Sequence, residues 1–393
     1  MIHLFINSLA ASAGGGVTYI RNVLPHLAGK TDLRVTVALS PGLLEEFRCF
    51  PNVDFLESDI TPVRRFWYEQ SVLPGVIRRC RADVLLSTGN FAVRKSPVPQ
   101  ILLSRNSTYT SPDFYRDLLS RHEYRAWLDT HLRAVLAKRS IRWADVTVAP
   151  SEAFASELSR WTGTHVLAIH HGFDHEAFTR DSSPLASEVE EKLRAVDGSL
   201  ELLFVSHYNY YRNFETLIRA LPLLRESLAP RTVKLLLTCR LDPRQNPGAY
   251  RPEKAADLVK RLGVSDMLVE LGALPYRQLH QLYVRADVYV TPAYTETFAH
   301  PLVEAMASGL PVIASDLAVH REICRDAAVY FPRFSSEKFA EAVAQVLRSE
   351  EASKRMVAIG LNRAHSFSWK THVDRVLELS ERLIESKGTR AAD

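Results

Sequence analysis

The sequence predicts an α/β protein built from two doubly wound domains, each with a mostly parallel sheet. Its 393 residues suggest about two domains of ordinary size. Short apolar runs alternate with segments of helical periodicity over the first half, and the alternation restarts near residue 200. Apolar strands separated by helices are typical of parallel sheets that are covered on both faces.

The first half contains apolar runs of strand length. Six are expected to be strands, namely residues 2–6, 33–39, 82–87, 100–104, 145–149 and 166–170. Apolar residues at helical spacing predict a helix over 17–27, directly after a glycine-rich loop. Residues 113–143 are rich in Arg and aromatic side chains and are expected to form one long helix. Its default interpretation is a mixed helical surface, and the alternative is a membrane-surface contact.

The second half repeats this plan behind a connector. Strands are expected at 200–206, 233–239, 267–271, 287–291, 311–315 and 329–331, helices at 213–228, 276–285 and 301–308, and a helical tail from 335 to the end. The expected domains are 1–172 and 199–365, with a connector at 173–198 and a tail at 366–393. Because ligands bind at the carboxyl ends of such strands, two of these domains predict a two-substrate cleft.

The composition is that of an ordinary globular protein, with 46% hydrophobic and 24% charged residues. The net charge is +4. Residues 1–172 hold 20 Lys and Arg against 15 Asp and Glu, an excess of +5, and the remainder of the chain has 29 against 30. A solvated basic surface is the default interpretation, and an anionic membrane or polyanionic substrate is the alternative. The four cysteines lie far apart without zinc spacing, which fits a reducing cytosol.

The most informative segment joins an expected strand to an expected helix. Pro301 suits the first turn of that helix, Gly309 suits the position after its end, and Pro311 prevents its continuation. A helix that begins after a strand offers free amides to a phosphate. Glu296 lies before this helix and Glu304 lies inside it, where they could accept hydrogen bonds from sugar hydroxyls. Alternatively, Glu304 pairs with a basic side chain and Glu296 interacts with the helix dipole.

The two glutamates and their surroundings resemble glycosyltransferase family 4, retaining enzymes with the GT-B fold. The resemblance rests on Glu296 and Glu304, on Phe298, and on the sequence that follows Glu304, Ala-Met-Ala-Ser-Gly-Leu-Pro-Val-Ile-Ala-Ser-Asp. Weaker matches extend across the chain, at 148–154, at 171–178, at 287–292 and at the Gly14-Gly15-Gly16 loop. Residues 65–70 and 104–106 resemble a branch of the family that acts in surface polysaccharide synthesis. In this fold, the C-terminal helices are expected to pack towards the first domain.

The resemblance implies a donor site in the second domain. Arg212 stands where the family carries a cation for the donor diphosphate, and Arg can bind phosphate bidentately. Glu296 is expected to contact the donor hexose and, with Arg212, to serve catalysis, whereas Glu304 is expected to accept hydrogen bonds from the ribose. Further expected donor contacts are Thr297, Phe298, Ala299, His300, Gly272 and Leu274, the last two against the base. The expected contributors from the first domain are Gly15, Gly16 and Asn106.

The sequence departs from the family pattern at three places. Gly-Arg after the first strand of the second domain is replaced by Ser206-His207, so the second diphosphate cation is either missing or supplied by His207 or Arg240. Phe-Gly is replaced by Phe298-Ala299. A His-Asp pair in the first domain is replaced by Arg105-Asn106, which puts the role of that histidine in doubt.

The function that these resemblances imply is transfer of a hexose from a nucleoside diphosphate sugar to a glycan or lipid-linked acceptor. No cofactor is expected beyond the donor, and no metal, because Asp-x-Asp is absent from the sequence. No nucleic-acid partner is expected. The expected location is the cytoplasm, with peripheral contact with the inner membrane face as an open alternative.

Three other functions compete with this one. A degenerate binding scaffold would fit the departures at Ser206-His207 and Arg105-Asn106. A nucleotide-sugar epimerase, a phosphorylase or an inverting transferase would share the fold. A dinucleotide oxidoreductase is disfavoured because the glycine loop lacks the GxGxxG spacing.

Overall fold

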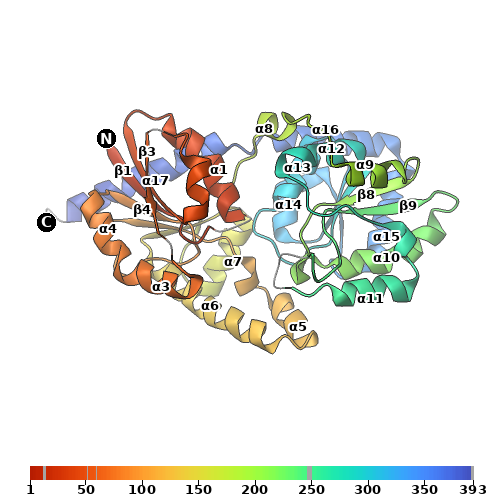
Figure 1. The fold of residues 1–393 in the computed structure, drawn as a ribbon, viewed down its shortest axis with the longest axis horizontal. Helices are drawn as coiled ribbons and strands as arrows, with labels where there is room; N and C mark the ends of the chain where they lie inside the picture. The colour runs from red at the N-terminus through yellow and green to blue at the C-terminus, as the bar shows by residue number, and fades with distance from the viewer. Residues whose placement is uncertain (12–14, 51, 59, 246–249, 391–393) are drawn as a thin grey trace. The chain divides into compact units, whose positions relative to one another are not determined.

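The computed structural model describes residues 1–11, 15–50, 52–58, 60–245 and 250–390 (Figure 1). The chain divides into two compact units. Unit 1 comprises Met1–Thr110, Glu123–Gly172 and Ser368–Asp393, and unit 2 comprises Ser111–His122 and Phe173–Phe367. Residues Ser111–His122 therefore fold with unit 2, although they lie between two strands of unit 1 in the chain.

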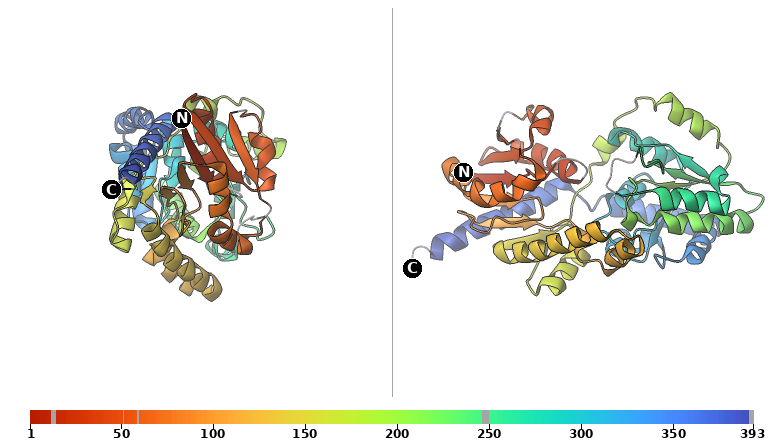
Figure 2. Two further views of the ribbon diagram at one scale, coloured as in Figure 1. Left: turned by 90° about the vertical axis from the view of Figure 1, so that its left-hand side faces the viewer. Right: turned by 60° about the horizontal axis from the view of Figure 1, so that its bottom comes forward.

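Unit 1 is built on a parallel sheet with strand order β3-β2-β1-β4-β5-β6-β7. The strands are β1 (Ile2–Asn7), β2 (Leu33–Leu39), β3 (Val53–Glu57), β4 (Val84–Ser87), β5 (Gln100–Leu103), β6 (Val146–Ala149) and β7 (Leu167–Ala168). Leu4 of β1 pairs with Val35 of β2 on one side and with Val84 of β4 on the other. Helices lie on both faces of this sheet, as the apolar strands predicted (Figures 1 and 2).

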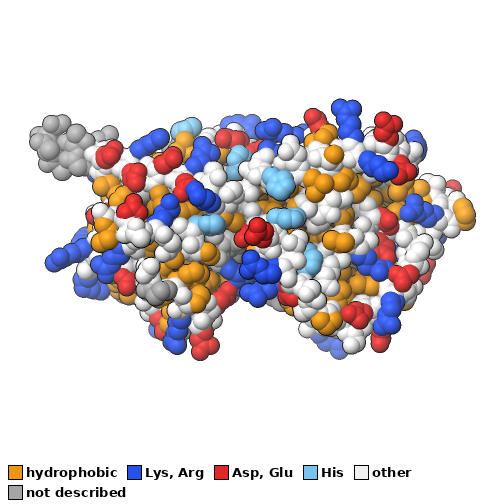
Figure 3. Space-filling view, turned by 90° about the horizontal axis from the view of Figure 1, so that it is seen from above, with side chains coloured by type: hydrophobic (Ala, Val, Ile, Leu, Met, Phe, Trp, Pro, Cys, Tyr) orange, Lys and Arg blue, Asp and Glu red, His pale blue; other side chains and the backbone are white. Residues whose placement is uncertain are grey.

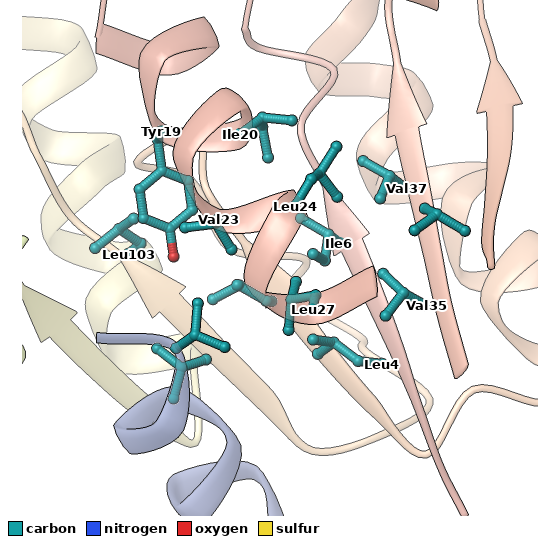
Figure 4. Packing of buried hydrophobic residues seen from close by; sticks show 14 of the residues in the cluster. Leu4, Ile6, Tyr19, Ile20, Val23, Leu24, Leu27, Val35, Val37 and Leu103 are labelled. Atoms are coloured by element: carbon teal, nitrogen blue, oxygen red, sulfur yellow. The ribbon is translucent and has the colours of Figure 1, made fainter. Parts of the chain in front are cut away.

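The helices of unit 1 fill its two outer layers. They are α1 (Gly15–Ala28), α2 (Leu44–Phe47), α3 (Pro62–Ser71), α4 (Leu73–Cys80), α6 (Tyr124–Trp143), α7 (Glu152–Thr162) and α17 (Trp369–Arg390). On α1, Tyr19, Ile20, Val23, Leu24 and Leu27 are buried at helical spacing and pack onto the strands (Figure 4).

The C-terminal helix belongs to unit 1. Trp369, Val373, Val376 and Leu377 of α17 are buried in the same core as α1, and the Tyr19 hydroxyl lies 3.0 Å from Nε2 of His372. The packing of the chain's end against the first domain, which the resemblance implied, is confirmed.

Unit 2 has a second parallel sheet, with strand order β10-β9-β8-β11-β12-β13. Its strands are β8 (Leu200–Phe204), β9 (Val233–Leu237), β10 (Leu268–Glu270), β11 (Val288–Thr291), β12 (Val312–Ser315) and β13 (Val329–Phe331). Its helices are α5 (Pro112–Ser120), α8 (His175–Thr179), α9 (Ser187–Arg194), α10 (Phe214–Ser227), α11 (Glu253–Leu262), α12 (Leu279–Arg285), α13 (His300–Ala307), α14 (Ala318–Cys324), α15 (Ser336–Arg348) and α16 (Glu350–Ala364). The prediction of two doubly wound α/β domains is confirmed.

Three local features add detail to the expected list of elements or differ from it. β3 was missed because it is a short edge strand in which Asp54 and Glu57 interrupt the apolar pattern. The expected helix over 113–143 is two helices, α5 and α6, which are separated at His122, whose φ of 58° is incompatible with a continuing right-handed helix. The helical tail expected from residue 335 is confirmed, and it consists of three helices, because Ser349 caps a new helix and Phe367 and Ser368 interrupt the next.

The surface carries charge of both signs. On the face seen in Figure 3, Lys and Arg side chains are interspersed with Asp and Glu, and they form no large patch of one sign. Among the described residues, no helix is long and apolar enough to cross a membrane. All four cysteines are free thiols.

Candidate functional site

The candidate site lies where the strand order of unit 2 reverses. From β8 the chain moves outward through β9 to β10, and from β11 it moves the other way through β12 to β13. The loops after β8 and β11 therefore leave in opposite directions and open a crevice at the carboxyl ends of the strands. Arg212 follows β8 and Glu296 follows β11. The topology thus brings together two residues that are 84 positions apart in sequence.

Asn213 fixes the loop that carries Arg212. Its φ of 57° and ψ of 46° are left-handed, a conformation that Asn tolerates better than most residues. Its side-chain amide donates to the carbonyls of Pro292 (3.0 Å) and Arg333 (2.6 Å), and its oxygen accepts from the Thr216 hydroxyl (2.9 Å). The loop after β8 is therefore tied to the end of β11, and Arg212 is presented from a fixed backbone.

Arg212 and Glu296 form a largely buried ion pair. Nη1 of Arg212 donates to Oε2 of Glu296, and the side chains are 21% and 11% exposed. Burial alone would raise the pKa of Glu296, but Arg212 and the backbone N–H of Thr297 hold that pKa below its usual value. Glu296 is therefore ionised at neutral pH. Within the part of the chain that the structure describes, Nε of Arg212 is buried and has no hydrogen-bond partner.

The loop continues through Phe298 and Ala299 into α13. Phe298 is 1% exposed and packs against the rings of His300 and Phe367. Ala299 has φ of 65° and ψ of 62°, a left-handed conformation that favours glycine. Pro301 lacks an N–H and the Leu302 N–H donates to the Ala299 carbonyl, so anion binding at this helix start would depend on the amides before Pro301.

Glu304 lies one turn inside α13 and is only 3% exposed. The Tyr283 hydroxyl donates to its Oε2 at 2.8 Å. Burial raises the pKa of Glu304 to about 7, although hydrogen bonds from Tyr283 and Tyr276 act in the opposite direction. No basic side chain is among these partners, so the alternative interpretation of Glu304 as half of a salt bridge is wrong.

A buried histidine beside Glu296 was not predicted from the sequence. His320 of α14 is fully buried, and its Nδ1 lies 3.0 Å from the Ser315 carbonyl and 3.1 Å from the Ser315 hydroxyl. That hydroxyl donates to the carbonyl of Ala293, which lies in the Glu296 loop. Burial lowers the pKa of His320 to about 4, so the ring is neutral. The one feature of the sequence that could have indicated His320 is its position five residues after the end of an expected strand.

The other expected donor residues have separate surroundings. The candidate cation Arg240 donates to Glu188 (2.6 Å) and Gln245 (2.7 Å). Gly272, with φ of 82°, lies beside it, and a Cβ there would meet Nε of Arg240 at 3.3 Å. The second candidate cation, His207, is exposed, and Leu274 is half-buried.

The expected first-domain contributors lie in unit 1. Gly14 is outside the described residues. A Cβ on Gly16 would lie 3.1 Å from the Ala11 backbone, whereas Gly15 has open space at that position. The Asn106 side chain accepts from the N–H and hydroxyl of Thr108. The residue that contacts the glycine loop is Arg105, which donates to the carbonyls of Gly15 (2.8 Å) and Thr88 (3.0 Å) and lies over the Tyr19 ring.

Helix α5 contacts the residues that flank the ion pair. Phe114 packs against the ring of Tyr211, the neighbour of Arg212, at 6.2 Å. The Tyr294 hydroxyl donates to Asp117 at 2.8 Å, and the Tyr294 N–H donates to the Tyr211 carbonyl. No sequence pattern predicts these contacts, because they join segments far apart in the chain.

A cavity of about 690 Å³ lies between α5, α10 and α11 within unit 2. The Arg121–Glu215 ion pair (2.7 Å) and Tyr294 form part of its lining, with exposed Arg219, Lys254 and Arg261. Arg212, Glu296 and Glu304 are not among its lining residues. The cavity is therefore a neighbour of the candidate site and does not contain its chemistry. In the described residues, no group of three or more His, Cys, Asp or Glu could hold a metal ion.

The chain is similar to glycosyltransferases along most of its length. Residues 13–177 match the family described as Glycosyltransferase Family 4, and residues 187–363 match Glycosyl transferases group 1. A D-inositol 3-phosphate glycosyltransferase from Nocardia farcinica is 27% identical over 265 residues. That match covers 66% of this chain and 57% of the relative, so the chain spans little more than half of the relative's length.

Solved structures share the fold at low identity. A sucrose-phosphate synthase from Thermosynechococcus elongatus has a TM-score of 0.77 and 18% identity, with 98% of this chain and 100% of that chain covered. The Anabaena protein HepE, solved with UDP-glucose, has a TM-score of 0.71 and 17% identity over the same shares of each chain.

Two Rossmann-like units on parallel sheets, with these structural neighbours, define a protein of the GT-B class. The two family matches follow one another along the chain and correspond to its two halves. The chain belongs to the GT-B glycosyltransferases of family 4.

Proposed function

We propose that this chain transfers a hexose from a nucleoside diphosphate sugar to a hydroxyl of a glycan or lipid-linked acceptor, with retention of configuration at the anomeric carbon. One observation carries the proposal. A buried arginine–carboxylate pair lies at the switch point of unit 2, directly before a helix start, with a second carboxylate one turn inside that helix. Such a site offers a cation and backbone amides to a phosphate and carboxylates to sugar hydroxyls. The names of the relatives and the UDP-glucose in HepE agree with this chemistry.

Arg212 is the group proposed to bind the diphosphate. One of its N–H groups is engaged by Glu296, and its buried Nε has no partner among the described residues. A guanidinium carries five N–H donors, so it can keep Glu296 and still bind phosphate oxygens. Because Glu296 neutralises this cation before a donor arrives, the ligand-free site avoids an isolated buried charge.

The proposed reaction breaks the bond between the anomeric carbon and the diphosphate oxygen. Negative charge then develops on the leaving diphosphate, and Arg212 together with the loop amides before Pro301 stabilises it. The acceptor hydroxyl attacks from the same face of the sugar, and its proton passes to an oxygen of the leaving phosphate. Glu296 would accept a hydrogen bond from a hexose hydroxyl and so hold the ring. These roles require no nucleophile from the protein.

Glu304 is proposed to accept hydrogen bonds from the ribose hydroxyls. The Tyr283 hydroxyl donates to Oε2, and an ionised carboxylate can accept about four hydrogen bonds, so Glu304 can accept more than its tyrosine partners supply. Ribose hydroxyls donate best to the ionised carboxylate, whereas burial holds its pKa near 7. Nucleotide binding would therefore lower this pKa and release a proton near neutral pH.

The remaining proposals concern the surroundings of the reaction. Gly272 and Leu274 are proposed to lie against the base, and Thr297 and His300 to line the donor loop. The site is proposed to work without a divalent metal, because Arg212 and amides take that role. Gly15, Gly16 and Asn106 are proposed to belong to the unit 1 side of the reaction. The acceptor is proposed to be a surface glycan or its lipid-linked precursor at the inner face of the membrane.

The test is a thermal-shift screen of the full chain against UDP, GDP and ADP and their sugars, with and without magnesium. One nucleotide is expected to raise the melting temperature equally with and without the metal, since only binding to the folded state stabilises. Arg212→Ala is expected to lose the shift, and Arg219→Ala, an exposed arginine in the following helix, is expected to keep it.

Three outcomes separate the possibilities. Wild-type shifts that vanish in Arg212→Ala support the donor site. Shifts without transfer or donor hydrolysis, measured by release of the nucleoside diphosphate, indicate a binding scaffold. No shift with any nucleotide contradicts the proposed site.

A further inference from the structure

Helix α6 carries an apolar stripe on its solvent side. Leu128, Leu132 and Val135 are 52%, 60% and 42% exposed, although large apolar side chains are usually buried. They are spaced by four and three residues, so they lie on one face of the helix. The opposite face, which includes Ala134, Ala137 and Ile141, is buried against unit 1. In Figure 1, α6 lies along the lower edge of unit 1, and the right-hand view of Figure 2 looks onto that side.

An arginine continues this stripe at each end. Arg125 lies three residues before Leu128, and Arg139 lies four residues after Val135, so both share the outward face. Both are exposed, and neither pairs with a carboxylate within the residues that the structure describes. We call Arg125, Leu128, Leu132, Val135 and Arg139 the α6 stripe.

The charged side chains of α6 itself are mostly positive. The helix contains five Lys and Arg residues and a single acid, Asp129. Arg133 neutralises that acid at 2.8 Å. A helix with exposed apolar side chains on one face and cations beside them is typical of a segment that lies in the interface of an anionic membrane.

We propose that the α6 stripe docks unit 1 onto an anionic lipid surface. In this arrangement the two leucines and Val135 enter the boundary between headgroups and acyl chains. Arg125 and Arg139 contact lipid phosphates, and their alkyl stems extend the apolar face. The proposal does not rest on the proposed transfer reaction, because the stripe contains none of the donor-site residues.

Two other occupants fit less well. Specific protein interfaces bury roughly 800 Å² on each partner, and a single row of three apolar side chains on one helix is smaller than that. Antiparallel pairing with a second copy is opposed by charge. Because Arg125 and Arg139 are equally distant from Leu132, pairing about that residue would place Arg125 of each copy beside Arg139 of the other.

The test uses the full chain and vesicles of phosphatidylcholine, with or without phosphatidylglycerol, in a sedimentation assay. Wild-type protein is expected to bind only the vesicles that contain phosphatidylglycerol, and less at high salt, because screening weakens the contribution of the arginines. Leu128→Ser/Leu132→Ser is expected to lower the partition coefficient about tenfold, because it removes the apolar surface that would enter the bilayer. Arg125→Gln/Arg139→Gln is expected to lower it by about the same factor and to reduce the salt dependence.

Matched control variants in unit 2 separate the stripe from general changes in charge and hydrophobicity. Val284→Ser/Leu361→Ser removes two other exposed apolar side chains, and Arg348→Gln/Arg355→Gln removes two other exposed charges. Both are expected to bind as the wild type does. Circular dichroism and melting temperature check the fold of every variant. If the leucine variant unfolds, the arginine variant still tests the proposal, because the substituted side chains are exposed and their replacement should not disturb the fold.

Three results would overturn the proposal. The first is wild-type protein that fails to bind the anionic vesicles. The second is stripe variants that bind as well as their controls. The third is a wild-type dimer, detected by sedimentation velocity, that the stripe variants dissolve, since the α6 stripe would then be an interface between copies.

Discussion

Two glutamates of the same motif, Glu296 and Glu304, are buried in opposite electrostatic environments. Glu296 faces the guanidinium of Arg212, and its pKa is held below the usual value. Glu304 faces tyrosine hydroxyls, and burial raises its pKa to about 7. The difference shows that the partner, and not the residue type or the degree of burial, decides whether a buried carboxyl is charged. A pair of acids with separated pKa values is typical of functional sites.

Removing the guanidinium of Arg212 should abolish the difference in pKa between Glu296 and Glu304. This variant has the largest expected effect. Arg212→Gln leaves Glu296 buried without a counter-ion, so its pKa should rise as that of Glu304 does. Transfer should fall by about 100- to 1,000-fold, because one group that stabilises the developing phosphate charge is lost. The measurement is kcat/KM with the nucleotide sugar that the thermal-shift screen selects. Glu296→Gln on the same background should change activity less than it does alone, and equal effects on both backgrounds would refute the coupling.

Glu304→Gln should change how the free energy of unfolding depends on pH. The folded pKa of Glu304 lies above its unfolded value, so the protonated form favours folding. The stability that this group contributes should be present below about pH 4.5 and lost as the pH rises to about 7. Glu304→Gln should therefore raise the free energy of unfolding at pH 8 by up to about 3 kcal/mol, with little change at pH 4.5.

The measurement is chemical denaturation of wild type and variant at pH 4.5, 6 and 8, values that bracket the folded pKa near 7. Glu226→Gln, an exposed glutamate of α10, is the control and should leave the pH profile unchanged. The variant should also weaken nucleotide binding. A destabilised Glu304→Gln protein at pH 8 would show that Glu304 is ionised and stabilising in the free enzyme.

Tyr294→Phe should have a smaller effect on stability and on donor KM, because it removes a contact between the Glu296 loop and α5. It removes the hydrogen bond from the Tyr294 hydroxyl to Asp117 and keeps the ring contact with Phe334. Because the acceptor is charged, the expected cost is about 1.5 kcal/mol of unfolding free energy. Donor KM should rise several-fold, since the Glu296 loop loses its tie to α5. The control, Tyr68→Phe, removes a hydrogen bond with the Ser58 hydroxyl in unit 1 and should leave KM unchanged.

Ala299→Gly should have the smallest effect and should be favourable. The left-handed conformation of Ala299 costs about 1 kcal/mol that glycine avoids, so the melting temperature should rise by about 2–4 °C. Ala358→Gly, the same substitution at an exposed site inside α16, should lower stability by about 1 kcal/mol. Equal and negative shifts for both variants would show that Ala299 is not strained.

The sequence by itself determined the two doubly wound domains and the position of Glu296 and Glu304 between a strand and a helix. Apolar periodicity is a local property, and the boundaries of α13 follow from Pro301 and Gly309. The edge strand β3 and the break at His122 were not predicted, because short elements and single left-handed residues change the apolar pattern of the sequence very little.

The tertiary structure alone decided which side chains of the site contact one another. These contacts join residues that are distant in the chain, namely the Arg212–Glu296 pair, the Glu304–Tyr283 hydrogen bond and the contacts of α5 with Tyr211 and Tyr294. No pattern in one sequence specifies which charged side chains will meet. Whether a carboxyl is ionised depends on its distance to such partners and on its exclusion from water, and both are properties of the folded chain.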